Sequence, residues 1–204
     1  MKGDIIEFYV DKFEYLKTSE GANLEFISSI ARRRMSKLDK VSLSVMHKCF
    51  DENIDYLVFS SCHGQVERLL KIIEQYSTLG EVSPSVFSGS VHNYGAGLFL
   101  LNSKKTIPYN ALCGGDNSIS SGILSAVISD YQNILFCYTD KNEDDFSGFA
   151  IKISKIPSKN SKKYIIRKKI AQICDNFDEF IKFFSGEINT LKTYIFEIER
   201  GYDD

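Results

Sequence analysis

One short segment constrains the fold of this chain more than any other, because residues 54–60 read IDYLVFS, an apolar run without alternation. A strand with one wet face alternates apolar and polar side chains, whereas a strand covered on both faces is apolar throughout. Such a strand needs helices on both sides of its sheet. Apolar residues at helical spacing over 27–50 and 65–76 supply two candidate helices. The run therefore predicts a layered α/β fold.

The rest of the chain continues this alternation of strands and helices. Strands are predicted over 5–10, 106–112, 133–139, 146–153 and 193–198, and helices over 90–101, 117–130 and 176–185. The acidic turn between 133–139 and 146–153 predicts a hairpin. Asp175 or Asn176 can cap the last helix, and Gly186 ends it. The alternation indicates a mostly parallel sheet covered by helices, in one domain spanning residues 1–204.

Composition excludes several classes of function. The net charge of −2 gives no reason to expect nucleic acid as a partner. No apolar run approaches the roughly 18–20 residues of a membrane span, and acids interrupt the first apolar stretch, so we expect a cytoplasmic protein without a membrane partner. Five cysteines without a C-x-x-C pair fit a reducing compartment. The basic segment 155–169 is predicted to be a solvated connection.

Three stretches carry a resemblance to a known family: ARRRMSKLDKVSLSVMHKC at 31–49, SSCHGQVERLLKIIEQY at 60–76, and the segment 83–126, which begins SPSVFSGSVHN and contains the turn GGDNS. They resemble the β-ketoacyl synthase-like N-terminal family, which implies the N-terminal half of a thiolase-like fold. The pattern is similar to that of chain-length-factor-like subunits in aryl polyene biosynthesis.

The resemblance implies a role in polyketide or fatty-acid-type chain elongation. It implies a full-length ketosynthase partner, in a heterodimer or a higher hetero-oligomer, and transient contact with an acyl carrier protein. In such pairs the strand before the catalytic elbow, here about 104–112, pairs across the two-fold axis. Side chains near that seam are expected to line the interface or the acyl tunnel of the synthase: Phe87, Val91, His92, Asn93, Tyr94, Leu98, Phe99, Ile107, Tyr109 and Leu112.

The departures from the family pattern predict a subunit that is not an enzyme. A working ketosynthase carries a nucleophilic cysteine at a strand-to-helix elbow, where the helix N-terminus lowers the pKa of the thiol. An ungapped count from Pro108 places Asp116 at that position, followed by Asn117 and Ser118, which suit a helix start. A carboxylate attacks thioesters poorly. The second half of a synthase, which supplies the two further catalytic residues, is not expected within these 204 residues.

Two alternatives involve the isolated cysteines and histidines. Cys113 lies near the elbow, so a small Cys-dependent acyltransferase or thioesterase using Cys113 with His92 or His63 stays open. A metal site is not predicted, because Cys62 and His63 are adjacent, and adjacent residues on a strand point to opposite faces. No cofactor is predicted. A basic turn, Arg32 to Arg34, is a candidate contact for an acidic carrier protein.

Overall fold

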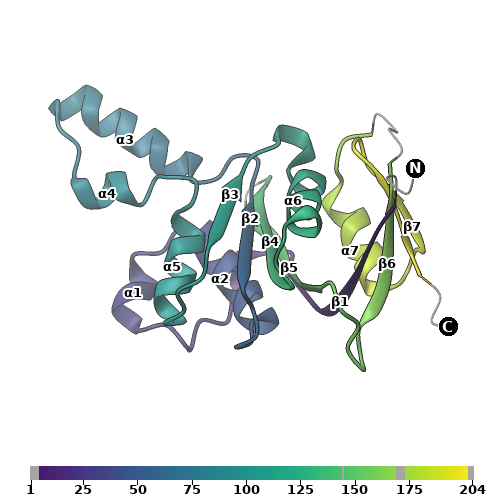
Figure 1. Cartoon of the computed structure of the whole chain (residues 1–204). Helices are drawn as coiled ribbons and strands as arrows, with labels where there is room; N and C mark the ends of the chain where they lie inside the picture. The colour runs from purple at the N-terminus through teal and green to yellow at the C-terminus, as the bar shows by residue number, and fades with distance from the viewer. Residues whose placement is uncertain (1–4, 144, 169–172, 202–204) are drawn as a thin grey trace.

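Eight strands form one mixed sheet in the computed structural model, which describes residues 5–143, 145–168 and 173–201 (Figure 1). In sheet order they are β3 (Tyr109–Leu112), β2 (Tyr56–Ser60), β4 (Asn133–Asn142), β5 (Asp145–Ser154), β1 (Ile5–Leu16), β6 (Lys162–Arg167), β8 (Glu197–Arg200) and β7 (Thr190–Lys192). β2 pairs in parallel with β3 and with β4. The other pairings in the described residues are antiparallel.

The α/β fold class is therefore confirmed, but the prediction of a mostly parallel sheet is wrong. Parallel neighbours need a crossover connection of a dozen or more residues, whereas a hairpin joins antiparallel neighbours directly. The expected hairpin forms between β4 and β5, which pair down to Asn142 and Asp145. β1 pairs with β5 in antiparallel orientation, and β6, β8 and β7 continue the sheet beyond β1. Along the chain, strands alternate with helices only as far as β4, and no described helix lies between β4, β5 and β6.

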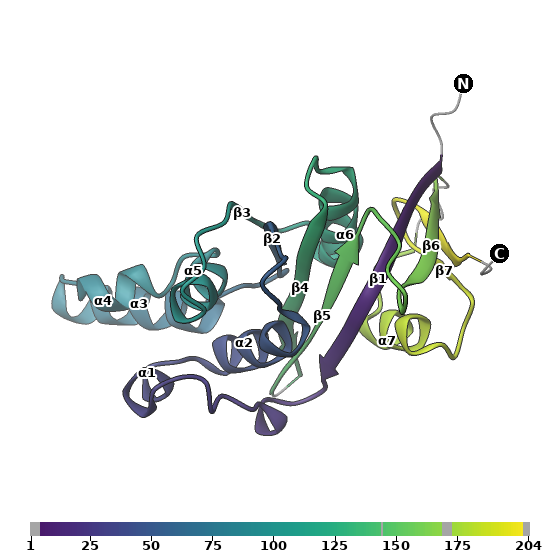
Figure 2. The same ribbon diagram turned by 60° about the horizontal axis from the view of Figure 1, so that its bottom comes forward.

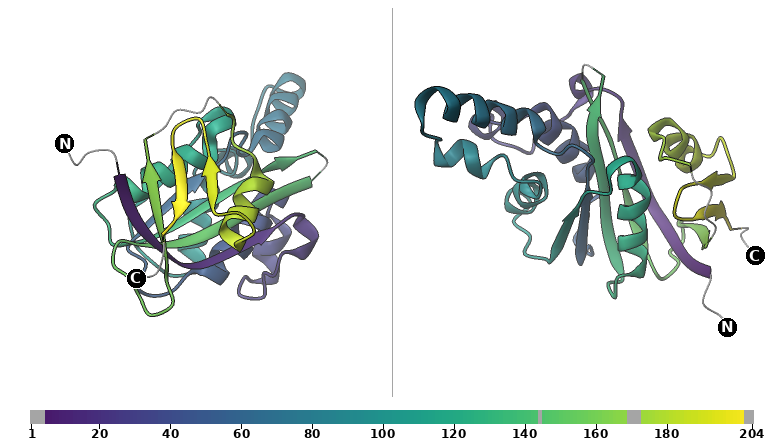
Figure 3. Two further views of the ribbon diagram at one scale, coloured as in Figure 1. Left: turned by 90° about the vertical axis from the view of Figure 1, so that its right-hand side faces the viewer. Right: turned by 90° about the horizontal axis from the view of Figure 1, so that it is seen from above.

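Helices cover both faces of the sheet. α2 (Lys37–Cys49) and α5 (Tyr94–Asn102) pack on one face, and α6 (Ser118–Ile128) and α7 (Phe177–Ser185) pack on the other. The right-hand view of Figure 3 shows α5 and α6 on opposite sides of the strands. β2 lies between these layers and is almost wholly buried, as its apolar run predicted. None of the described helices is long and apolar enough to cross a membrane.

The predicted helix over 27–50 is divided into α1 (Ser29–Arg33) and α2. Ser36 begins α2 with a capping box, in which its hydroxyl accepts from the Asp39 amide and the Asp39 carboxylate accepts from the Ser36 amide. This reciprocal cap satisfies the amides of Ser36 and Asp39, which in a continuous helix would donate to carbonyls of the preceding turn. The chain therefore turns at residues 34–36, where apolar spacing alone gave no break.

The basic segment 155–169 was predicted wrongly as a solvated connection. Within it β6 pairs with β1, and Tyr164 and Ile166 enter the core while Lys162 and Arg167 face water. The short aromatic and β-branched run Tyr164, Ile165 and Ile166 was the missed signal, because the flanking basic residues masked it. Residue 169 lies outside the described residues. The strand predicted over 193–198 is displaced, since β8 begins at Glu197 and a short β7 precedes it.

An arm projects from the body of the molecule beside β2. It consists of α3 (Val66–Leu79), α4 (Pro84–Ser88) and the loop between them (Figures 1 and 2). Only Ile72 of α3 is buried. Exposed apolar side chains cover the arm: Leu69, Leu70, Ile73, Tyr76, Leu79, Val86 and Phe87. The apolar stripe that predicted this helix therefore faces outward from the described chain.

Candidate functional site

The elbow between β3 and α6 is built by two glycines and a short 3-10 turn. Gly115 adopts a left-handed backbone with φ of 58°, which favours glycine. The 3-10 turn Gly115–Asn117 follows and leads directly into α6. Ser118 closes the turn, since its hydroxyl accepts from the Gly114 amide at 3.0 Å and donates to the Gly115 carbonyl at 2.7 Å. The exposed Asp116 therefore stands at the N-terminal end of α6.

A second carboxylate caps the same helix. The Ser120 amide donates to Asp175 Oδ2 at 2.7 Å, and the Asp175 amide donates to the Asp116 carbonyl at 3.1 Å. Asp175 was expected as a possible cap of α7, but Asn176 has that role, because its side chain accepts from the Glu179 amide. Burial raises the pKa of Asp175 to about 6. Local spacing gave no sign of this contact, because the two partners are 55 residues apart.

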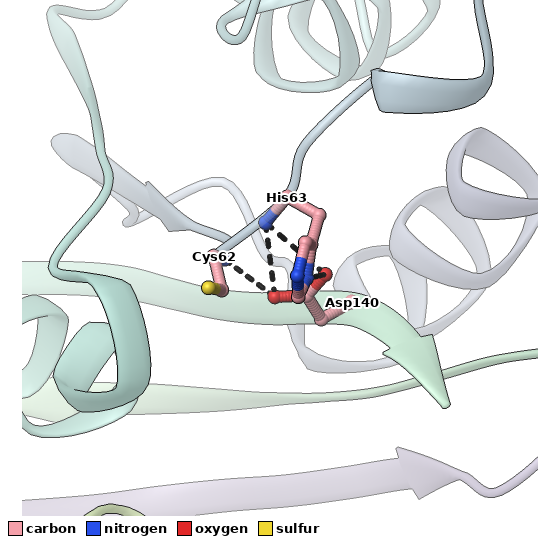
Figure 4. Close-up of side chains that lie close together, drawn as sticks. All are labelled: Cys62, His63 and Asp140. Carbon is pink, nitrogen blue, oxygen red and sulfur yellow. Dashed lines mark hydrogen bonds and ion pairs between the residues drawn. The ribbon is translucent and has the colours of Figure 1, made fainter. Parts of the chain in front are cut away.

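Asp140 organises the loop that follows β2 (Figure 4). The Cys62 amide donates to Asp140 Oδ2 at 2.5 Å, and the Lys141 amide donates to Oδ1 at 2.8 Å. His63 reaches the carboxylate through its amide at 3.3 Å and through Nδ1 at 3.0 Å from Oδ1. The Asp140 side chain is only 5% exposed. It is therefore a fixed anchor for this loop. No short-range pattern predicted the contact, because Asp140 lies in β4, 78 residues after Cys62.

These groups meet in one pocket of about 220 Å³. Its lining comes from the loop after β2, the elbow, the end of β4 and the segment before α7. The polar and sulfur-bearing residues among them are Cys62, His63, Asp116, Ser118, Tyr138, Asp140, Lys141, Cys174 and Asp175. Three carboxylates face one lysine, so the pocket favours a cation or hydrogen-bond donors.

Cys113 is exposed at the end of β3, and its thiol donates to the Cys62 carbonyl at 3.1 Å. In the described part of the chain it has no hydrogen bond with a histidine. His92 Nε2 donates to the Leu112 carbonyl at 2.9 Å, and His63 is bound to Asp140. Burial, then the negative neighbours Asp140, Cys113 and Asp116, raise the pKa of Cys62. The geometry therefore does not assemble the Cys–His pair that a thiol enzyme needs.

The residues expected at the interface or tunnel fall into three groups. Four of them are exposed: Phe87 on α4, Val91 and Asn93 just before α5, and Tyr109 on β3. Asn93 Nδ2 donates to Tyr109 Oη at 3.2 Å. His92, Tyr94, Leu98, Ile107 and Leu112 are half-buried. Phe99 is fully buried and packs edge-on against Phe50, so it belongs to the core of this chain. In the described chain Phe99 therefore offers no surface to a partner.

A buried ion pair fixes the root of the arm. Arg68 of α3 pairs with the fully buried Asp39 of α2 at 2.8 Å and donates to the carbonyls of Gly89 and Arg34. Its guanidinium also lies 4.8 Å from the Tyr94 ring centre. Removing one member of a buried pair leaves the other charge unpaired, which is strongly destabilising. This ion pair ties the arm to α2 and α5, and Glu67 of α3 adds an ion pair with Lys141 of β4.

Comparison with solved structures supports the thiolase-like fold. The chain matches one described as "Ketosynthase (ApeO) in Complex with its Chain Length Factor (ApeC) from Xenorhabdus doucetiae", with a TM-score of 0.72 and 15% sequence identity. The match covers 96% of this chain and 100% of that chain. A search of curated proteins found no match.

Comparison with protein families gives a match over residues 11–157, to the family described as beta-ketoacyl synthase, N-terminal domain. The matched region runs from β1 to just beyond β5. It contains the elbow, the arm and the loop after β2, and it covers well over half of the 204 residues. This chain therefore belongs to the β-ketoacyl synthase N-terminal domain family.

Proposed function

We propose that this chain is a non-catalytic, chain-length-factor-like subunit that pairs with a full-length β-ketoacyl-ACP synthase and shapes its acyl tunnel. The observation that carries the proposal is the elbow, where Asp116 stands at the N-terminal end of α6 and the Asp175 carboxylate caps the same helix. The structurally similar protein is itself described as a ketosynthase in complex with its chain length factor. The acyltransferase activity would then reside in the partner.

The electrostatics of the elbow support catalytic silence. The N-terminus of a helix stabilises negative charge, and a catalytic thiolate at an elbow depends on that effect. Here the Asp175 carboxylate already binds the Ser120 amide, and Asp116 adds a second negative charge nearby. A thiolate placed beside them is disfavoured by like charge. A cysteine in place of Asp116 would still lie beside the Asp175 carboxylate, so this substitution alone would not restore an active synthase.

The edge of the sheet supports the pairing. β3 is the last strand of the sheet on its side, so one row of its backbone groups has no neighbour among the described strands. The carbonyls of Pro108 and Leu112 bind β2, and backbone groups alternate along a strand, so Tyr109 and Ala111 direct theirs outward. An open edge of this kind pairs readily with another strand. We infer that β3 meets its counterpart in the synthase.

The arm supports an extended contact beside that edge. Its apolar side chains gather on α3 and α4, and large exposed apolar patches mark interaction sites. We infer that Phe87, Val91 and Tyr94 reach the mouth of the synthase tunnel. Enlarging or shrinking one of these side chains should then change the length of the product. Identical product distributions across the whole set would contradict the tunnel role.

The carrier-protein contact is proposed between the end of α1 and the first turn of α2. Arg32, Arg33 and Lys40 line a surface hollow of about 470 Å³ together with Ser29. A cluster of cations steers an acidic partner and depends on salt. The contact would therefore be transient and would weaken as the ionic strength rises.

The decisive experiment is co-expression of this chain with a full-length ketosynthase, with only the synthase tagged. We expect a complex in size exclusion and condensation that requires both subunits. Cys113→Ala in this chain should leave the rate unchanged. Thioester turnover by this chain alone that disappears in Cys113→Ala, without any complex, would overturn the proposal.

A further inference from the structure

We propose that Cys62, His63 and Asp140 bind a divalent transition-metal ion, of which Zn²⁺ fits best. A sulfur, a ring nitrogen and a carboxylate oxygen from these residues lie within 4.8 Å of one another (Figure 4). Thiolate, imidazole and carboxylate are the ligands that Zn²⁺ takes in proteins. The proposal does not depend on the pairing with a synthase.

The turn after β2 brings adjacent residues to one ion. β2 ends at Ser60, so the strand argument against a Cys62–His63 pair is wrong here. The Ser61 hydroxyl accepts from the Gly64 amide at 2.8 Å, and Gly64 has φ of 54°. In this tight turn the amides of Cys62 and His63 both point at Asp140. These hydrogen bonds therefore hold the backbone of Cys62 and His63 in place, and both side chains lie close to the Asp140 carboxylate.

The distances are close to those that a metal needs. Ligands at 2.0–2.3 Å in a tetrahedron lie about 3.5 Å apart. His63 Nδ1 and Asp140 Oδ1 are already 3.0 Å apart. The widest separation in the cluster is at most 4.8 Å, so closure requires a movement of about 1 Å. The His63 side chain is 58% exposed and is free to make it.

Asp140 has the character of a prearranged ligand. Ligating carboxylates are oriented by outer hydrogen bonds, and these partners contribute to metal affinity. Here the amides of Cys62, His63 and Lys141 orient the carboxylate. Metal binding would replace the His63–Asp140 hydrogen bond, with the ring proton on Nε2 and both Nδ1 and Oδ1 facing the ion.

The charges balance. Cys62 releases its thiol proton to solvent, and the thiolate together with the Asp140 carboxylate neutralises the two positive charges. Asp116 and Asp175 line the same pocket and add a field that favours a cation. The only cation among the described residues that line it, Lys141, pairs with Glu67 at 3.6 Å. Three protein ligands leave the fourth position to water.

The test uses the purified full chain, first treated with chelator. Titration with Zn²⁺ should show one saturable site by calorimetry, and Co²⁺ should give a thiolate-to-metal charge-transfer band. Cys62→Ser and His63→Gln should each weaken Zn²⁺ binding by more than the roughly 10- to 100-fold that loss of an outer partner costs. Cys62→Ser should also abolish the cobalt band.

Matched controls separate this site from other thiols and imidazoles. His47→Gln should leave the affinity and the cobalt band unchanged, and Cys113→Ser should keep the cobalt band, because neither residue is a ligand in the cluster. Thermal unfolding checks that each variant is folded, and His63→Gln changes a mostly exposed side chain. Absence of a saturable site in the wild-type chain, or a cobalt band that survives in Cys62→Ser, would overturn the proposal.

Discussion

At the scale of single residues, close contacts decide which side chains the chain tolerates. Gly64 is the clearest case, because a Cβ there would lie 2.5 Å from His92 Nδ1. The His92 ring is held by its hydrogen bond to the Leu112 carbonyl and lies edge-on to Phe59. The turn after β2, the start of α5 and the end of β3 thus meet at one glycine.

Gly64→Ala should therefore lower the free energy of unfolding by more than the backbone strain alone. A left-handed residue other than glycine costs about 1–3 kcal/mol, and the contact with His92 adds to that. Gly80→Ala is the matched control, since Gly80 has φ of 72° but nothing within 4 Å of the added atom. Urea unfolding of both variants measures the difference, and equal losses would show that the His92 contact is irrelevant.

The pH dependence of stability should report on Asp175. Its pKa is raised by burial to about 6, so the folded chain binds a proton that the unfolded chain releases near pH 4. The contribution of Asp175 to stability therefore falls as the pH rises from about 4 to above 6, by on the order of 3 kcal/mol. Asp175→Asn should remove that fall, because the asparagine amide does not titrate. Its side-chain oxygen can still accept from the Ser120 amide, so the cap is kept.

The control for this measurement is Asp178→Asn, which changes a carboxylate exposed at the first turn of α7. We expect its profile of unfolding free energy against pH to follow the wild type between pH 4 and 8. A wild-type profile that rises through this range, or one that Asp175→Asn does not alter, contradicts the assignment.

Among the helices and strands, the helices cover the faces of the sheet, whereas the outer side of an edge strand has no partner within the sheet. α6 and α7 together cover the face of the sheet opposite α2 and α5. Phe180, Phe183 and Phe184 of α7 are buried against β1, β5 and β6. β3 and β7 are the two edge strands of the sheet, and no other described strand pairs with the outer side of β3.

Ala111→Pro should separate folding from pairing at that edge. Proline removes an outward N–H, and edge strands tolerate it where the N–H faces away from the sheet. We expect the variant to keep most of its stability but to lose at least about 10-fold in affinity for the synthase. Ala111→Ser retains the amide and should pair normally. Equal binding of the two variants in a pull-down would exclude backbone pairing through Ala111.

In the molecule as a whole, the arm presents a group of exposed apolar side chains on α3 and α4. Phe87 is 61% exposed, so changing it costs this chain little by itself. Aromatic anchors at interfaces contribute roughly 2 kcal/mol or more when their contact is buried in the complex. The position of the arm next to α5 places this contact close to the proposed tunnel.

Phe87→Asp should therefore weaken the complex with the synthase by about 10-fold or more while leaving the unfolding midpoint nearly unchanged. Ile156→Asp is the matched control, because Ile156 is 64% exposed but lies beyond β5, away from the arm and from β3. Surface plasmon resonance on an immobilised synthase compares the two. A larger loss for Ile156→Asp would place the interface elsewhere.

The sequence by itself determined the elements that depend on local patterns. The apolar run of β2, the hairpin of β4 and β5, a cap of α7 at residue 175 or 176, and the Gly186 end of α7 all follow from neighbouring residues. The family motifs likewise placed Asp116 at the elbow. These features require only short-range spacing and turn chemistry, which are written directly in the order of residues.

Only the tertiary structure decided the mixed sheet, the strand in the basic segment, and the contacts of Asp140 and Asp175. Each of these depends on residues far apart in the chain: β1 on β6, Cys62 on Asp140, and Ser120 on Asp175. Burial against a distant partner outweighed local preference, since β6 is a strand although lysines flank it. Contacts of this kind arise when the chain closes into layers, and no local period in the sequence encodes them.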